Sequence, residues 1–225
     1  MWLKSFAFGL SCAALASSAG AQAPRQVCSN ATGHHDGFYF TFWKDGGDAC
    51  MTLAPKGRYS TRYHLVPRKN LVVGKGWEVG SKERRLGYRA TFEPGANSYL
   101  TLYGWSVDPL VEYYVVDSWG SAFKPPGESA PVLGTVESDG GTYQIYRTTR
   151  VEKPSILGTQ TFTQFWSVRT ERRPQGADAA ITFSNHVRAW ERLGMRLGTM
   201  NYQVMATEGF GSTGRSEVTV WEQPR

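Results

Sequence analysis

Cysteine is scarce in this chain, with three among 225 residues. Cys12 lies in the apolar stretch at the N-terminus, so Cys28 and Cys50 are the only thiols in the rest of the sequence. One pair is too few for a structural zinc site without suitably spaced histidines. In an exported chain the pair favours a disulfide, and two separate buried thiols remain the alternative.

Histidine is also rare, with four residues. His34, His35 and Asp36 form the only cluster that resembles a set of metal ligands. Adjacent histidines between glycines belong more often to a polar loop than to a metal site. We therefore expect a loop there, no bound metal and no cofactor.

Long apolar runs are missing, and none reaches the ~20 residues of a membrane-spanning helix. Residues 1–23 contain one positive charge, Lys4, then an apolar stretch and a tail of small residues. This layout is typical of a secretory signal peptide, with a membrane anchor as the weaker alternative. Cleavage after Ala21 is favoured, because cleavage after Ala23 would leave Pro24 first. The sequence thus predicts a leader at 1–21, secretion, and no membrane partner.

Repeats, low-complexity tracts and proline-rich linkers are absent as well, which argues against an appended module. We expect residues 22–225 to form a single domain. The net charge is +6, but the basic residues are scattered and no nucleic-acid-binding motif accompanies them. The sequence therefore predicts no nucleic-acid partner and leaves open a weak attraction to acidic polysaccharide.

Glycine, with 25 residues, and aromatic side chains, at 13% of the chain, are abundant. Short alternating runs follow one another between turn signals, which is typical of an all-β fold. Strands are expected at 37–43, 58–65, 71–77, 86–92, 97–105, 110–116, 142–150, 159–170, 201–209 and 217–221. The segment between the two long strands, 152–158, is expected to be a projecting hairpin loop with an apolar tip at Ile156.

A helix is expected only at 183–195. Phe183, Val187, Trp190 and Leu193 recur there at spacings of four, three and three, which places them on one apolar stripe. Ser184 is a candidate cap near the start, and Gly194 can end the helix. The stripe is interpreted as the face that docks on a sheet.

The strand pair at 97–120 contains an unusual acidic residue. Alternation places Tyr99, Thr101, Tyr103 and Trp105 on one face of the first strand. On the second strand Glu112 lies between apolar and aromatic neighbours, where acidic residues are depleted. An outward-facing or salt-bridged glutamate is one interpretation, and a carboxylate whose pKa is adjusted for chemistry is the other.

A second glutamate of the same kind favours the chemical interpretation. Glu208 ends the alternating row Tyr202, Val204, Ala206 on another strand. Glycosidases need two carboxyl groups, one that attacks or stabilises the sugar carbon and one that protonates the departing oxygen. The aromatic side chains fit the same interpretation, because sugar rings stack on tyrosine and tryptophan through their apolar faces.

The sequence also resembles a known family on several motifs. NSYLTLYGWSVDPLVEYYVVDSWG, KPSILGTQTFTQFWSVR, ITFSNHVRAWERLGM and YQVMATEGF, with FWKDGGDACMTL and KNLVVGKGW upstream, are similar to glycoside hydrolase family 11, the small secreted endo-β-1,4-xylanases. The resemblance implies a β-jelly roll of two curved, mostly antiparallel sheets that form a cleft. It also implies one helix packed on the outer side, and hydrolysis with retention of configuration.

The resemblance assigns roles to individual residues. Glu112 is expected to be the nucleophile and Glu208 the general acid/base. Asn70 matches the position beside the acid/base, where asparagine accompanies near-neutral or alkaline optima and aspartate acidic ones; unlike aspartate, asparagine has no proton to share with Glu208. Substrate-binding roles are expected for Trp43, Tyr103, Trp105, Tyr114, Arg150, Pro154, Ile156, Gln164 and Tyr202.

The sequence therefore predicts a monomeric, secreted endo-β-1,4-xylanase that acts on xylan. Phe210 and Leu157 stand where the family often has a tyrosine and a polar residue, which affects binding strength and not the reaction type. One alternative is a non-catalytic carbohydrate-binding β-sandwich, which requires no pair of facing carboxylates. The other is a β-1,4-glucanase on the same architecture, and an assay on xylan against carboxymethylcellulose separates them.

Overall fold

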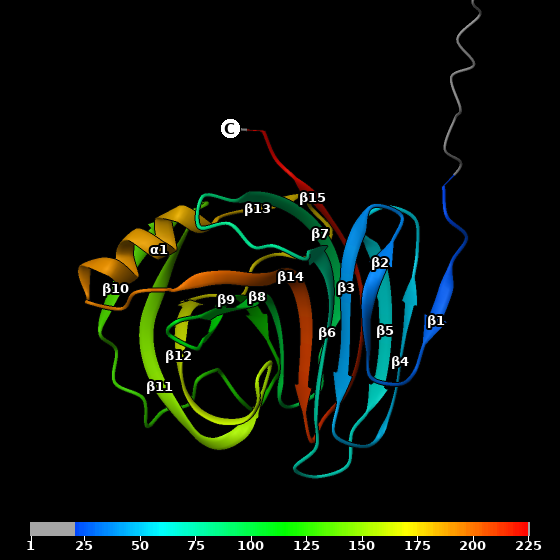
Figure 1. Cartoon of the computed structure of the whole chain (residues 1–225), viewed down its shortest axis with the longest axis horizontal. Coiled ribbons are helices and arrows are strands. Elements are labelled where there is room, and N and C mark those ends of the chain that lie inside the picture. Colours follow the sequence, from blue (N-terminus) through cyan, green and yellow to red (C-terminus); the bar gives the residue numbers. More distant parts are fainter. Residues whose placement is uncertain (1–20, 225) are drawn as a thin grey trace, which may run out of the picture.

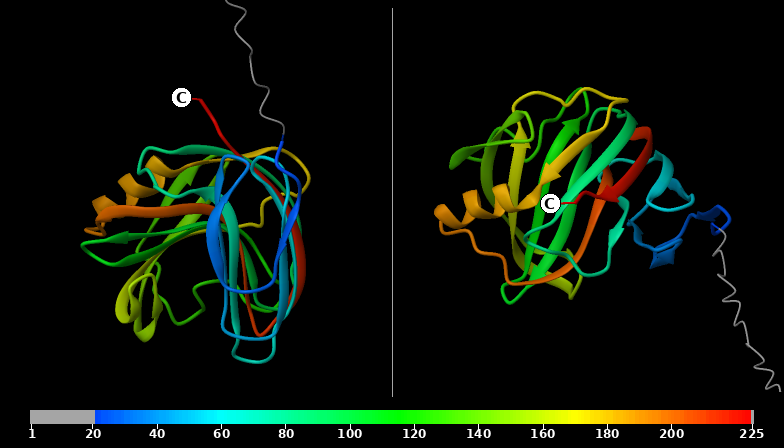
Figure 2. Two further views of the ribbon diagram at one scale, coloured as in Figure 1. Left: turned by 45° about the vertical axis from the view of Figure 1, so that its right-hand side comes forward. Right: turned by 90° about the horizontal axis from the view of Figure 1, so that it is seen from above.

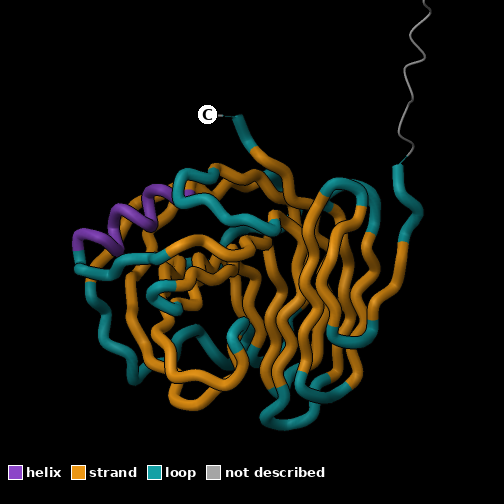
Figure 3. The backbone as a smooth tube through the Cα atoms, viewed as in Figure 1, coloured by secondary structure: helices purple, strands orange, loops and turns teal. Residues whose placement is uncertain are grey.

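The computed structural model describes residues 21–224. The predicted leader at 1–21 lies outside the described residues except for Ala21. Strands make up most of this part of the chain (Figure 3). The all-β class that the alternating runs predict is confirmed.

The elements follow one another in quick succession. In chain order they are β1 (Arg25–Val27), β2 (Ala31–His35), β3 (Phe38–Lys44), β4 (Asp48–Leu53), β5 (Arg58–His64), β6 (Asn70–Trp77), β7 (Arg85–Glu93), β8 (Ser98–Val107), β9 (Val111–Trp119), β10 (Gly134–Ser138), β11 (Gly141–Ser155), β12 (Gly158–Arg169), β13 (Ala179–Thr182), α1 (Phe183–Arg192), β14 (Thr199–Phe210) and β15 (Thr213–Glu222).

The strands form two sheets, seen from three directions in Figures 1 and 2. The six-stranded sheet has the order β1-β4-β5-β15-β7-β13. The nine-stranded sheet has the order β10-β11-β12-β9-β8-β14-β6-β3-β2. The strand pairs are antiparallel except β12 and β9, which run parallel. This is the sandwich of mostly antiparallel sheets that the family resemblance implies.

The main hydrophobic core lies between the two sheets. Phe40 and Phe42 of β3 and Tyr113 and Val115 of β9 face it from the nine-stranded sheet, and Tyr59 of β5 faces it from the other. All are nearly inaccessible to solvent. Since side chains alternate along a strand, the sequence neighbours of the β3 and β9 residues point to the opposite face of the nine-stranded sheet.

That opposite face carries a second apolar cluster, which we call the aromatic face. It contains Tyr99, Tyr103 and Trp105 of β8, Tyr114 of β9, Phe162 and Trp166 of β12, and Val204 and Ala206 of β14. The expected sharing of faces along β8, β9 and β14 is confirmed. The nine-stranded sheet is therefore apolar on both sides, and β8 and β9 are buried along almost their whole length.

Register shifts interrupt three of the ladders in this sheet. They lie between Leu100 and Thr101 on β8, between Arg150 and Lys153 on β11, and between Met200 and Gln203 on β14. An extra residue on one strand bends it and increases the local twist. These bulges fit the curled sheet of Figure 2.

Helix α1 begins at Phe183, as predicted, and ends at Arg192. Phe183, Val187 and Trp190 are buried in the main core, so the apolar stripe does dock on the sheets. The proposed cap at Ser184 is wrong: Thr182 occupies the cap position, without a side-chain hydrogen bond, and Ser184 lies inside the helix. Gly194 has a φ of +73°, which suits the end of a helix.

The loop expected at the histidine pair is wrong, whereas the hairpin expected at 152–158 is confirmed with a shorter turn. The segment 152–158 is mostly strand, because β11 continues to Ser155 and β12 starts at Gly158, with only Ile156 and Leu157 between them. The histidine pair lies at the end of strand β2, where His35 is buried and its Nε2 is 2.8 Å from the backbone oxygen of Ala23. Burial and backbone pairing explain His35 without a metal.

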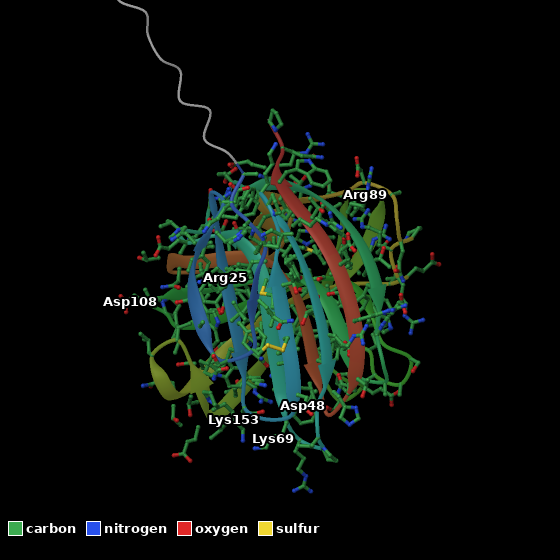
Figure 4. The ribbon with its side chains drawn as sticks, turned by 90° about the vertical axis from the view of Figure 1, so that its right-hand side faces the viewer. Arg25, Asp48, Lys69, Arg89, Asp108 and Lys153 are labelled. Carbon is green, nitrogen blue, oxygen red and sulfur yellow. A yellow bond between two sulfur atoms is a disulfide. The ribbon has the colours of Figure 1, made fainter. Side chains whose placement is uncertain are left out.

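A disulfide joins Cys28, between β1 and β2, to Cys50 on β4. Figure 4 shows this bond near the strand that carries Arg25. It ties the short first strand to the second strand of the six-stranded sheet. Among the helices of the described part, none is long and apolar enough to cross a membrane.

Candidate active site

The two unusual glutamates lie on one face of one sheet. Glu112 on β9 pairs with Trp105 on β8 and with Gln164 on β12. Glu208 on β14 pairs with Tyr99 on β8. Both side chains alternate with core residues, so both belong to the aromatic face. Each is buried, with 7% of Glu112 and 6% of Glu208 exposed.

The carboxylate of Glu112 is held by a donor at each oxygen. The Tyr103 hydroxyl donates to Oε1 at 2.7 Å, and the Gln164 amide donates to Oε2 at 2.6 Å. The pKa of Glu112 is raised above its ordinary value, because burial outweighs the hydrogen bonds from Tyr103, Gln164 and Tyr114 and the charge of Arg150, which lower it. The donors thus counteract the burial and favour the ionised form.

Glu208 has a different environment. Its Oε1 accepts one long hydrogen bond from Nδ2 of Asn70, at 3.5 Å, and its Oε2 has no partner among residues 21–224. Burial, followed by the charge of Glu112, raises the pKa of Glu208 to about 8. Glu208 therefore keeps its proton near neutral pH.

The side chain of Asn70 has a fixed orientation. Its Oδ1 accepts a hydrogen bond from the backbone N–H of Leu71 at 2.9 Å, which leaves Nδ2 for Glu208. The backbone N–H of Asn70 donates to Asp45 at 2.6 Å, which anchors the start of β6. The sequence prediction that Asn70 lies beside Glu208 matches this geometry.

Aromatic rings surround Glu112. The Tyr103 ring lies 5.1 Å from that of Tyr114 and 6.0 Å from that of Tyr202. Tyr114 stacks on Trp166 with 3.8 Å between the ring centroids and 7° between the planes. Trp105 donates its indole N–H to the Tyr103 hydroxyl at 2.8 Å. These rings form a rigid wall around the carboxylate.

The other expected binding residues lie on strand β3, on strand β11 and in the hairpin between β11 and β12. Trp43 on β3 is half-buried against the aromatic cluster, and through Val72 it stands in the same cross-strand row as Glu208. Arg150 on β11 carries a charge that acts on both glutamates. Ile156, in the hairpin turn, is half-buried against the aromatic face, whereas Pro154, near the end of β11, is exposed.

Sequence reasoning missed three residues of the site. Tyr99 pairs with Glu208, Trp166 stacks on Tyr114, and the Thr148 hydroxyl donates to Oε1 of Gln164 at 2.9 Å. Alternation could have placed two of them on the face of the site. Trp166 is two residues from Gln164 on β12, and Thr148 is two residues from Arg150 on β11, so each pair shares a face. Threonine and tryptophan are ordinary strand residues, however, so nothing marks them.

Within the described range, no group of three or more His, Cys, Asp or Glu side chains is placed to hold a metal ion. The chemistry of this face lies in the two carboxyl groups. Glu112 has a hydrogen-bond donor on each oxygen and, when ionised, can attack an electrophilic carbon. The other is protonated and can deliver a proton to a leaving oxygen.

The sequence of this chain matches a family model and several known proteins. The family model described as Glycosyl hydrolases family 11 matches residues 35–219. Endo-1,4-beta-xylanase B of Phanerodontia chrysosporium is 45% identical over 198 residues, which cover 88% of this chain and 66% of that protein. Probable endo-1,4-beta-xylanase B of Aspergillus clavatus is 45% identical over 199 residues, covering 88% of this chain and 86% of that protein.

Some relatives are much longer. The bifunctional xylanase/xylan deacetylase of Cellvibrio japonicus is 47% identical over 199 residues, which cover 87% of this chain and only 30% of that protein. The present chain thus spans about a third of this relative and slightly less than two thirds of the Phanerodontia protein.

Proposed function

Because this chain belongs to glycosyl hydrolases family 11, we propose that it is an endo-1,4-β-xylanase that hydrolyses internal bonds of xylan with retention of configuration. The observation that carries the proposal is the difference between two buried carboxyl groups on one face. Glu112 has a donor on each oxygen, whereas Glu208 has a pKa of about 8. A retaining glycosidase needs this division between nucleophile and acid.

In the first step Glu112 attacks the anomeric carbon while Glu208 gives its proton to the glycosidic oxygen. The carbon–oxygen bond to the departing xylan segment breaks, and an ester to Glu112 forms. In the second step Glu208, now a carboxylate, takes a proton from water, and the water oxygen displaces Glu112 from the sugar. Glu112 carries no charge in the ester, so the repulsion that raises the pKa of Glu208 is absent.

The remaining expectations form part of this proposal. The xylan chain lies on the aromatic face, with Trp43 as a stacking surface and Arg150, Gln164 and Tyr202 as polar contacts near the reacting sugar. Tyr103, Trp105 and Tyr114 line the site, and Pro154 and Ile156 press on the substrate from the hairpin. Residues 22–225 act as one monomeric, secreted domain after removal of the leader at 1–21.

Activity on two polymers and one variant tests the proposal. Wild-type protein releases reducing ends from xylan and far fewer from carboxymethylcellulose. Glu112→Gln lowers the turnover of xylan by roughly 10³-fold or more, because the amide cannot form the ester, while circular dichroism remains unchanged. Proton NMR of fresh products shows the β-anomer first. Substantial activity of the variant excludes Glu112 as nucleophile, and initial α-anomer excludes retention.

A further inference from the structure

Each oxygen of the Glu112 carboxylate ends a chain of hydrogen bonds that begins at an indole N–H. On one side Trp105 donates to Tyr103, which donates to Oε1. On the other side Nε1 of Trp166 lies 2.9 Å from Oγ1 of Thr148, which lies 2.9 Å from Oε1 of Gln164. Nε2 of Gln164 then lies 2.6 Å from Oε2 of Glu112. The second chain contains a residue with no role so far.

The direction of the second chain follows from its first member. An indole nitrogen can only donate, so Oγ1 of Thr148 must accept from Trp166. The single hydroxyl proton of Thr148 then goes to the neighbouring oxygen of Gln164. Once that oxygen accepts, the amide NH₂ of Gln164 is the group that faces Glu112.

An amide side chain has two similar ends, and only one of them suits an anion. Rotated by half a turn, Gln164 would present its oxygen to the carboxylate, and two acceptors would face each other. The hydroxyl of Thr148 disfavours the rotated form, because only in the observed orientation does its proton reach the oxygen of Gln164 while the NH₂ group faces the carboxylate. Burial strengthens the selection, since Gln164 is 8% exposed and Trp166 is 5% exposed.

We propose that Thr148 is a positioning residue for the nucleophile: its hydroxyl, oriented by Trp166, holds the Gln164 amide with NH₂ toward Glu112 and so stabilises the ionised carboxylate. Thr148 acts through Gln164 and is not itself a catalytic residue. The inference rests on the proposed function only in naming Glu112 the nucleophile, because the hydrogen bonds exist whatever the substrate.

Glu112 has other charged and titratable neighbours, and these remain in place when Thr148 changes. Tyr103 and Tyr99 face it from β8, Tyr114 from its own strand, Arg150 from β11, and Glu208 and Tyr202 from β14. Tyr103, held by Trp105, still donates a hydrogen bond to Oε1 of Glu112. A change at Thr148 therefore isolates the donor at Oε2.

The test compares Thr148→Val, which keeps the shape and removes the hydroxyl, with Thr148→Ser, which keeps the hydroxyl. Carboxyl-carbon NMR of labelled glutamate follows the titration of Glu112 in the full chain. We expect Thr148→Val to raise the measured pKa of Glu112 by about 1 and Thr148→Ser to restore it. In Thr148→Val the acidic limb of the pH profile of kcat/KM moves to higher pH by the same amount. The fall in kcat is larger than the change in KM.

Thr149→Val is the matched control, because Thr149 is the next residue on β11, is exposed, and faces away from Glu112. It leaves both the titration and the pH profile unchanged. If Thr148→Val does not fold by circular dichroism, Thr148→Ala takes its place. A pKa of Glu112 equal to wild type in the folded variant overturns the proposal, and so does a serine variant as altered as the valine one.

Failure of the proposed function has a separate signature. If wild-type protein does not hydrolyse xylan, the substrate assignment fails while the titration of Glu112 still reports on Thr148. If xylan is hydrolysed but the titration does not respond to Thr148→Val, only the positioning role fails.

Discussion

At the scale of single residues, Glu208 shows how the same burial serves chemistry and destabilises the fold. A carboxyl group prefers to ionise at neutral pH, yet in the folded chain its pKa is raised to about 8 by burial and by the charge of Glu112. The unfolded chain ionises at an ordinary pKa near 4.5. The folded state thus binds the proton more tightly, and stability falls as the pH rises from that value through 8.

We therefore predict that Glu208→Gln stabilises the protein at neutral pH. Glutamine keeps the shape of the protonated acid and never ionises. The difference in the free energy of unfolding between Glu208→Gln and wild type should increase in favour of the variant by roughly 3 kcal/mol between pH 4 and pH 7. Urea unfolding at both pH values measures it. Glu83→Gln, at an exposed position, is the control and should show almost no growth. An equal effect of both variants would contradict the prediction.

The two glutamates could be found from the sequence because each interrupts a strand pattern. Glu112 and Glu208 break apolar rows, and the rest of their motifs resembles one family. The residues that form the hydrogen-bond network around Glu112 are harder to identify from the sequence. Thr148 and Trp166 lie on strands that tolerate such residues anywhere, and only the register of β11, β12 and β9 brings them to Glu112. Pairing between strands far apart in sequence is not encoded in any local pattern.

At the scale of elements, helix α1 carries a buried histidine without hydrogen bonds. Neither ring nitrogen of His186 has a partner in the part of the chain that the structure describes, and the ring packs edge-on against Tyr143 at 4.8 Å. Burial lowers the pKa of His186 to about 3. The unfolded chain takes up the proton near pH 6.5, so stability falls as the pH decreases from 6.5 toward 3.

Replacing this histidine should protect the fold against acid. For His186→Leu we expect the free energy of unfolding, relative to wild type, to improve by roughly 3 kcal/mol between pH 7.5 and pH 4. Thermal unfolding followed by far-ultraviolet circular dichroism at a series of pH values checks it. The exposed His34→Leu serves as the reference and should give parallel curves. A slope unchanged by His186→Leu would refute the prediction.

Elements were predicted better than their ends. Apolar alternation located the strands of the site and the start of α1, because burial of one face dictates that pattern. The hairpin between β11 and β12 has a shorter turn than the loop expected at 152–158, where proline and glycine locally favour a turn. Backbone pairing of Lys153 with Gln160 and of Pro154 with Thr159 outweighs that local preference. The cap at Ser184 failed for a similar reason: the preceding strand β13 ends at Thr182 and sets where the helix begins.

At the scale of the whole molecule, a buried ion pair connects the two sheets. Asp117 on β9 is inaccessible, and Nε of Arg173, in the connection from β12 to β13, lies 2.6 Å from its carboxylate. The same carboxylate accepts hydrogen bonds from Tyr88 on the six-stranded sheet and from Tyr143 on the nine-stranded sheet. Four segments thus meet at one negative charge.

We predict that Arg173→Met lowers the free energy of unfolding by roughly 3–5 kcal/mol, because it leaves an unpaired charge in the interior. Arg58→Met, which breaks the exposed pair with Glu217, should lower it by about 1 kcal/mol or less. Denaturant unfolding at pH 7 compares the two. The double variant Arg173→Met with Asp117→Asn should recover part of the loss. Similar small losses for both single variants would contradict a structural role of the buried pair.

The aromatic face has a consequence for how binding and folding are related. A sheet with apolar side chains on both sides normally forms the middle of three layers. The described residues supply two layers, and the tyrosines and tryptophans around Glu112 form the inner boundary of a third. In the proposed function a polysaccharide strand occupies that layer while it is bound. In that proposal the nine-stranded sheet is covered on both faces only while the polysaccharide is bound.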